Sequence, residues 1–185
     1  MTLLRPSSSN LNLVQGEHVV SGDANVMLTT ILGSCVAACM RDPLAGVGGM
    51  NHFLLPGALN GLEQGLERGV HAMELLINAL LKVGARRERL EAKLFGGGRM
   101  MKTLSDIGAQ NGAFATDFLR QERIVNLGGS LGGDRARRIR FWPVSGKVQQ
   151  MLVGQGETGV FAREMKVAAA PPPPATGDND VEFFD

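Results

Sequence analysis

This sequence has few of the features that mark membrane, secreted or nucleic-acid-binding proteins. Its 185 residues include only two cysteines, and its formal net charge is only +1. No apolar run approaches the ~20 residues needed to cross a bilayer, and the N-terminal residues lack the hydrophobic stretch of a signal peptide. We therefore expect a cytoplasmic protein without membrane insertion, in which thiols stay reduced. A charge near neutrality does not indicate general binding to nucleic acid.

The two cysteines, Cys35 and Cys39, are four residues apart. On a β-strand this spacing corresponds to ~13 Å, which is too far for a disulfide. With His52 they could supply three metal ligands, but no further cysteine or nearby histidine completes a zinc set. The pattern favours free thiols, and we expect neither a metal nor an organic cofactor.

Short apolar segments and one clear amphipathic segment predict an α/β domain. Apolar residues recur at helical spacing over residues 70–83, and Gly84 follows as a C-terminal cap. A second helix is expected over 113–122, and residues 57–68 are expected to form a surface loop. Close-set strands with two or three helices between them favour a layered domain with a largely antiparallel sheet. The strands are expected at 19–20, 26–32, 92–95, 123–127, 138–142 and 147–153.

A predicted β-hairpin places Cys35 and His52 on opposite arms. Residues 42–46, Asp-Pro-Leu-Ala-Gly, have the chemistry of a turn between two apolar runs. With the turn centred on Leu44, Cys35 and His52 are one position out of register. A one-residue bulge at Gly48-Gly49 would pair them directly. Cross-strand neighbours lie ~5 Å apart at Cβ, so the thiol and the imidazole could share a proton.

Both residues also have a purely structural explanation. A free cysteine is most often a small buried hydrophobe, and a lone histidine in an apolar arm is usually a core residue. A catalytic His52 needs a group that fixes its tautomer. No Asp or Glu adjoins it, but the hydroxyl of Thr29 or Thr30 could accept a hydrogen bond from the ring. Backbone N–H groups around Ser34 and Cys35 could receive an oxyanion.

The two ends of the chain differ from its middle. We expect residues 1–11 to be flexible, residues 12–167 to form the domain, and residues 168–185 to form a proline-rich spacer with an acidic tail. Four prolines at 171–174 are typical of a stiff, extended spacer. The last eight residues carry four acidic side chains and no basic one. The tail is either a docking motif, a mask for the basic body, or an inert end.

Several segments resemble the CheD family of chemoreceptor glutamine deamidases. The most specific are Leu-Gly-Ser-Cys at 32–35 and His-Phe-Leu-Leu-Pro at 52–56, within the longer similar segments 29–36, 41–43 and 48–56. The likeness continues through 73–78, 92–98, 107–111 and 132–141. It covers roughly residues 12–153.

This resemblance implies a three-layer α/β sandwich with a mostly antiparallel or mixed sheet, similar to the catalytic domains of deamidating bacterial toxins. It places the nucleophile on Cys35, the base on His52 and a third catalytic residue, a threonine, on Thr29. Gly33 and Ser34 would support the site through their backbone. Where the family commonly has Asp before Leu-Gly-Gly, this chain has Ser130.

The implied substrate is a glutamine side chain on a methyl-accepting chemotaxis receptor, hydrolysed to glutamate and ammonia without a cofactor. Some relatives are also credited with hydrolysing receptor methyl esters, and in some bacteria the partner is a CheC-type phosphatase. Two other classes stay open at this point. A non-catalytic adaptor would keep the fold, and a cysteine peptidase or transglutaminase-like enzyme would use the same pair on another acyl group.

Overall fold

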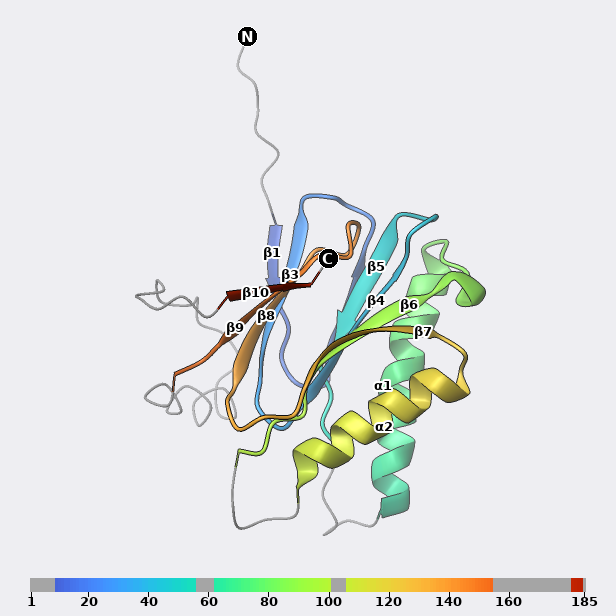
Figure 1. Cartoon of the computed structure of the whole chain (residues 1–185). Coiled ribbons are helices and arrows are strands. Elements are labelled where there is room, and N and C mark those ends of the chain that lie inside the picture. The colour runs from blue at the N-terminus through green and yellow to red at the C-terminus, as the bar shows by residue number, and fades with distance from the viewer. Residues whose placement is uncertain (1–8, 56–61, 101–105, 155–180, 185) are drawn as a thin grey trace.

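The computed structural model describes residues 9–55, 62–100, 106–154 and 181–184 (Figure 1). Within these ranges no helix is long and apolar enough to span a membrane. The helices are α1 (Leu62–Lys82), α2 (Ile107–Gln121) and the short 3-10 helix η2 (Arg87–Arg89). The strands are β1 (Ser9–Asn12), β2 (His18–Ser21), β3 (Val26–Leu32), β4 (Val36–Asp42), β5 (Val47–Asn51), β6 (Glu91–Gly96), β7 (Val125–Leu131), β8 (Arg137–Phe141), β9 (Val148–Leu152) and β10 (Val181–Phe184).

The strands and helices form three layers. One five-stranded sheet has the order β1-β3-β8-β9-β10, and a second has the order β2-β5-β4-β6-β7. The two long helices cover the face of the second sheet that points away from the first (Figure 1). Most neighbouring strands are antiparallel, while β1–β3 and β6–β7 are parallel. This confirms the expected α/β sandwich, with two mixed sheets.

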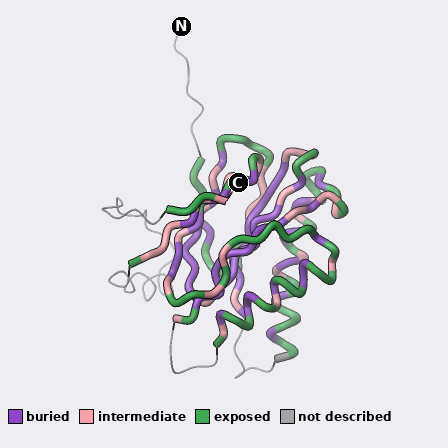
Figure 2. The backbone as a smooth tube through the Cα atoms, viewed as in Figure 1, coloured by how far each residue is buried: buried purple, intermediate pink, exposed green. Residues whose placement is uncertain are grey.

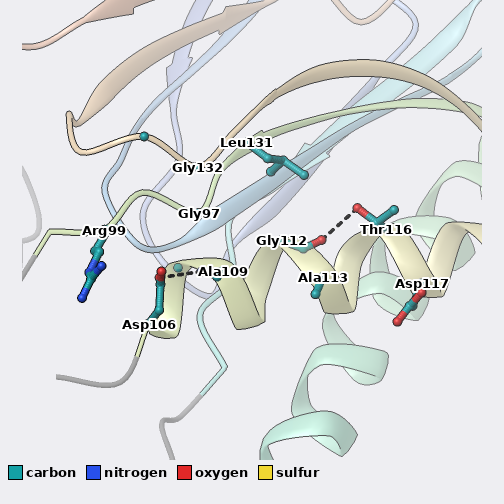
Figure 3. A pocket seen from close by; sticks show the side chains of 12 residues that line it. Gly97, Arg99, Asp106, Ala109, Gly112, Ala113, Thr116, Asp117, Leu131 and Gly132 are labelled. Carbon is teal, nitrogen blue, oxygen red and sulfur yellow. Dashed lines mark hydrogen bonds between the residues drawn. The ribbon is translucent and has the colours of Figure 1, made fainter.

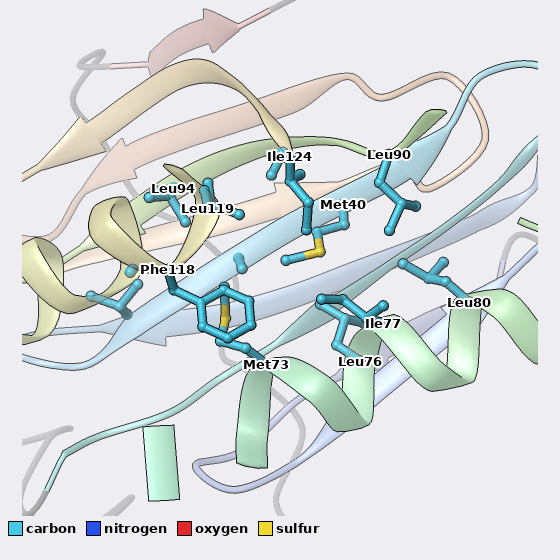
Figure 4. Packing of buried hydrophobic residues seen from close by; sticks show 14 of the residues in the cluster. Met40, Met73, Leu76, Ile77, Leu80, Leu90, Leu94, Phe118, Leu119 and Ile124 are labelled. Carbon is cyan, nitrogen blue, oxygen red and sulfur yellow. The ribbon is translucent and has the colours of Figure 1, made fainter. Parts of the chain in front are cut away.

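Strand β4 separates two hydrophobic cores because its side chains alternate between faces. Val36, Ala38 and Met40 pack on the helix side, whereas Ala37 and Cys39 pack between the sheets. The helix-side core is filled mainly by α1 and α2, through Met73, Leu76, Ile77, Leu80, Phe118 and Leu119 (Figure 4). Figure 2 shows that buried residues are concentrated along the central strands and on parts of the helices. Each such large side chain stabilises the fold by about 1.5–3 kcal/mol.

Both long helices begin earlier than the sequence predicts. Most of the expected apolar face of α1 is buried, although Val70 at its start is exposed. Helix α1 already starts at Leu62, so the loop expected over 57–68 is wrong from that residue onward. Gly69, just after the predicted loop, serves helix packing. A Cβ atom there would lie 2.5 Å from Leu55 and 2.7 Å from Phe114. Helix α2 starts at Ile107, where the Asp106 side chain accepts a hydrogen bond from the Ala109 N–H at 2.9 Å.

The hairpin of β4 and β5 forms, but its register differs from the prediction by one residue. Asp42 pairs with Val47 and Cys39 pairs with Met50, and no bulge interrupts the ladder. The Asp42 carboxylate shapes the turn, because it accepts hydrogen bonds from the N–H groups of Leu44 and Ala45 at 3.0 Å. A hydrogen bond from Arg89 holds the pKa of this buried carboxyl well below its usual range. The expected bulge and direct pairing of Cys35 with His52 are therefore wrong.

Both predicted ends contain folded residues. Residues 9–11, expected to be flexible, lie in β1, which pairs with β3. Residues 181–184 of the expected tail form β10, an edge strand on β9. Phe184 packs edge-on against Phe95 with ring centroids 5.2 Å apart, and Lys93 Nζ donates to the Phe184 carbonyl oxygen at 2.8 Å. The four prolines lie outside the described residues.

Candidate active site

Cys35 and His52 lie where the hairpin arms meet at their open end. Cys35 ends the short loop between β3 and β4, and His52 directly follows β5. The adjacent residues Val36 and Phe53 pair through two backbone hydrogen bonds of 3.0 and 2.9 Å. Cys35 and His52 are thus diagonal neighbours on one face, the face between the sheets where Cys35 packs. Diagonal neighbours lie ~7–8 Å apart, within reach of long side chains.

The His52 ring is held by a buried hydroxyl on the opposite sheet. Thr30 Oγ1 lies 2.8 Å from the Leu13 carbonyl oxygen and 2.8 Å from His52 Nδ1. A carbonyl oxygen only accepts and a hydroxyl has one proton, so Thr30 donates to Leu13 and accepts from Nδ1–H. This assigns the tautomer with a lone pair on Nε2. That atom is buried, and it has no hydrogen-bond partner among the described residues. Such a ring can take up a proton.

The threonine that reaches the ring is Thr30 and not Thr29. Side chains on β3 alternate, and Leu28 and Leu32 point between the sheets. Thr30 shares their face, whereas Thr29 points to the other face and donates its hydroxyl to the Ile139 carbonyl oxygen at 2.9 Å. The assignment of Thr29 as the group that orients His52 is therefore corrected to Thr30.

The carbonyl groups of the loop that carries Cys35 accept hydrogen bonds that hold the loop in place. Gly97 N–H donates to the Cys35 oxygen and Gly98 N–H to the Gly33 oxygen, both at 2.8 Å. A peptide unit is planar and trans, so each carbonyl and the following N–H point in opposite directions. The N–H of Ser34 therefore points away from the glycine loop, residues 96–98. Within the described part of the chain, no backbone acceptor bonds the N–H of Ser34, and the N–H of Cys35 is directed at the sulfur of its own side chain.

Asn111 is a positioning residue that the sequence did not single out by its chemistry. It is fully buried on α2, where its Nδ2 donates to the Ser34 carbonyl oxygen and its Oδ1 accepts from the Leu55 N–H, both at 2.8 Å. It thus joins the cysteine loop to the segment that follows His52. It also turns the Cys35 N–H away from α2, by the same planarity argument. The only sequence signal was its place in the similar segment 107–111.

Burial keeps both candidate catalytic groups neutral. It raises the pKa of the Cys35 thiol to about 11, opposed by the backbone N–H of the same residue. It lowers the pKa of His52 to about 4, opposed by the Leu13 carbonyl. Near pH 7 the free protein therefore holds a thiol and a neutral imidazole instead of an ion pair. Proton transfer between them is uphill until a substrate changes their surroundings.

Gln15 is a second residue that the sequence analysis missed. Its side-chain oxygen Oε1 accepts a long S–H hydrogen bond from Cys35 Sγ at 3.8 Å. Gln15 is exposed, and it lies in the segment between β1 and β2, far from Cys35 in sequence. No motif marks this residue, because only the packing of the two sheets brings the segment to the thiol.

A cavity of about 490 Å³ lies between the start of α2, Gly97 and the end of β7 (Figure 3). Neither Cys35 nor His52 lines it. Its walls include Gly97, Arg99, Asp106, Gly112, Thr116 and Leu131. Throughout the described ranges, no group of three or more His, Cys, Asp or Glu side chains is placed to hold a metal ion.

Ser130 stands beside a buried arginine. The Arg137 guanidinium donates to the Ser130 carbonyl oxygen at 2.9 Å, to Ser130 Oγ at 3.1 Å and to the Gly132 carbonyl oxygen. Only 2% of Arg137 is exposed, and no described carboxylate lies within salt-bridge distance of it. Its Nε atom is buried without an acceptor among the described residues, and burial lowers its pKa.

The fold and this site define a class: three-layer α/β proteins with a cysteine and a histidine on one inner sheet face. The family model described as CheD chemotactic sensory transduction matches residues 55–151. A protein from Rhizobium rhizogenes is 52% identical over 98% of this chain and 100% of its own length. One from Caulobacter vibrioides is 52% identical over 94% of this chain and 92% of its own length. Both are named "Probable chemoreceptor glutamine deamidase CheD".

This chain belongs to the CheD family. Another relative with the same name, from Agrobacterium fabrum, is 51% identical over 98% of this chain and all of its own length. Among solved structures, protein NMB0706 of Neisseria meningitidis aligns with 63% of this chain and 53% of its own, at 10% identity and a TM-score of 0.43. That score is too low to support an argument about a shared fold.

Proposed function

We propose that this protein hydrolyses glutamine side-chain amides on chemoreceptors to glutamate and ammonia, through a thioester on Cys35. The names of its relatives support the deamidase activity and the receptor substrate. One observation carries the mechanism. A neutral imidazole, fixed as its Nδ1–H tautomer by Thr30, has an unpartnered Nε2 on the sheet face that also carries Cys35.

In the first half of the proposed reaction, His52 Nε2 takes the proton of the Cys35 thiol. The thiolate attacks the amide carbon of the substrate glutamine, and a carbon–sulfur bond forms. The negative charge moves to the amide oxygen, which the N–H groups of Ser34 and Cys35 can bind. The imidazolium then gives its proton to the amide nitrogen, the carbon–nitrogen bond breaks, and ammonia leaves.

In the second half, water attacks the thioester. His52 Nε2 takes a proton from this water, the carbon–sulfur bond breaks, and the imidazolium returns that proton to the leaving sulfur. The products are glutamate on the receptor and the regenerated Cys35 thiol. Thr30 touches no reacting atom in this scheme. It holds the ring so that Nε2 faces the reaction in both halves. A receptor methyl ester would follow the same path, with methanol leaving in place of ammonia.

Recognition of the receptor must involve more than the glutamine itself, because glutamine side chains are chemically alike. The residues before the acidic tail carry a net excess of basic side chains, which suits an acidic partner surface. A CheC-type phosphatase is a second partner that we propose from the family resemblance alone.

The test is mass spectrometry of a receptor cytoplasmic fragment after incubation with this protein. Deamidation adds about 1 Da at each modified glutamine, because an amide becomes an acid. An unchanged fragment would point to an adaptor. A cleaved backbone would indicate a peptidase, and an incorporated amine would indicate a transferase. Each of these three results would contradict the proposed activity.

A further inference from the structure

The thiol of Cys35 is bonded to a glutamine of its own chain. Cys35 Sγ lies 3.8 Å from Gln15 Oε1, so the S–H group donates to an amide oxygen. Because each thiol has one proton, this hydrogen bond competes with donation to the candidate base. His52 Nε2 accordingly has no hydrogen-bond partner within the described ranges. In the free protein the thiol faces an amide instead of the imidazole.

The backbone around Gln15 is fixed to the same site. Residues 13–17 cross from β1 on one sheet to β2 on the other. Gly16 N–H donates to the His52 carbonyl oxygen at 2.7 Å, and His52 N–H donates to the Glu17 carbonyl oxygen at 3.0 Å. The Leu13 carbonyl accepts the Thr30 hydroxyl at 2.8 Å. The backbone is thus held on both sides of Gln15, while its exposed side chain contacts the Cys35 thiol.

We propose that Gln15 is an internal mimic of the substrate, whose amide occupies the place beside Cys35 until a substrate glutamine displaces it. This inference rests on the proposed deamidase function, because only then is the displaced group chemically the same as the incoming one. Displacement frees the thiol to rotate toward His52, so that the pair forms only when a substrate is present.

The usual position of a donor relative to an amide explains how Gln15 can contact the thiol without being attacked. A donor bound to an amide oxygen lies near the plane of the carbonyl group. A nucleophile must instead approach the carbonyl carbon from above that plane. The amide of Gln15 is therefore bound by the thiol and not consumed, and we expect Gln15 to remain a glutamine in the purified protein.

Alkylation of Cys35 by iodoacetamide tests this contact without any receptor. We compare the full-length wild type with Gln15→Ala and with Val14→Ala, a matched change at an exposed neighbour. Losing one weak hydrogen bond at the thiol should raise the alkylation rate of Gln15→Ala roughly 3- to 10-fold, while Val14→Ala should match the wild type. Cys39 is only 3% exposed and serves as an unlabelled internal control. On a receptor fragment, Gln15→Ala should show a higher kcat/KM for deamidation.

Three results would overturn the mimic. They are an unchanged alkylation rate in Gln15→Ala, a raised KM with lowered kcat/KM in that variant, and conversion of Gln15 to Glu in the wild type but not in Cys35→Ala. The two assays distinguish failure of the mimic role of Gln15 from failure of the deamidase function. Faster alkylation of Gln15→Ala with no deamidation by any variant would support the contact and refute the deamidase function. Normal deamidation by the wild type with unchanged alkylation would refute the mimic alone.

Discussion

The buried hydroxyl of Thr30 offers the sharpest perturbation of the proposed mechanism. Thr30→Ala removes the acceptor for His52 Nδ1–H and the donor to the Leu13 carbonyl oxygen, each now bonded at 2.8 Å. Thr30 is fully buried, so water does not readily replace the lost hydroxyl. The ring is then free to turn or to change tautomer. Thr29→Ala is the matched control, because Thr29 points to the other face of β3 and its hydroxyl bonds the Ile139 carbonyl oxygen on the neighbouring strand β8.

The size of the effect follows from the two lost hydrogen bonds. A buried polar group left without a partner costs about 1–3 kcal/mol, and we expect Thr30→Ala to lose stability in that range. If the misplaced Nε2 raises the activation free energy by a similar amount, kcat should fall about 10- to 100-fold. KM should change little, because Thr30 does not touch the substrate. Thr30→Ser keeps a hydroxyl and should recover most of the activity.

The assay is steady-state ammonia release from a receptor cytoplasmic fragment, with thermal unfolding measured on the same samples. The expected order of kcat is wild type, Thr29→Ala and Thr30→Ser together, then Thr30→Ala far below. The orienting role of Thr30 is refuted if Thr29→Ala is the slower of the two alanine variants. It also fails if Thr30→Ser is as slow as Thr30→Ala, because the hydroxyl would then not be what matters.

Three further predictions concern the described structure. Burial lowers the pKa of His52 to about 4 from 6.5, so between these pH values the unfolded chain binds a proton that the folded chain does not. The free energy of unfolding should therefore keep its full value above pH 6.5 and fall by about 3 kcal/mol as the pH drops toward 4. Urea titrations at several pH values should show a smaller fall for His52→Gln. Ser130→Asp should raise the free energy of unfolding by about 1–3 kcal/mol, because it gives buried Arg137 a counter-charge. If Ser130→Asn is as stable as Ser130→Asp, the charge is not the cause and this prediction is refuted. Phe184→Ala should cost about 2 kcal/mol and exposed Phe183→Ala less, as thermal unfolding can show, and equal losses would contradict the docking of β10.

Sequence periodicity predicted the layers well, because hydrophobic burial dictates them. The helical spacing of the apolar residues of α1 identifies its buried face before any coordinates are known. Alternation along β3 does not separate the two threonines, because apolar residues stand on both faces of this strand: Leu28 and Leu32 on the face of Thr30, and Met27 and Ile31 on the face of Thr29. Only the packing of the two sheets shows that Thr30 reaches His52. Resemblance to the family pointed to Thr29 because it matches a position and not a side-chain direction.

The hairpin register could not be read from local sequence. It depends on how many residues the turn holds, and Asp42 decides this by binding both the turn and Arg89. That arginine lies 47 positions away in the chain. Gln15 and Asn111 escaped notice for the same reason. Each reaches the cysteine loop only through contacts between layers, which no spacing pattern records.

The claim on which this account depends is that the sulfur of Cys35 attacks the substrate amide. The most direct measurement compares ammonia release from a receptor fragment by Cys35→Ala and by Cys39→Ala, the second cysteine, which lies on the same strand face. We expect no release above background from the folded Cys35→Ala protein and substantial release from Cys39→Ala. Release by Cys35→Ala within a few-fold of the wild type would contradict the thioester mechanism.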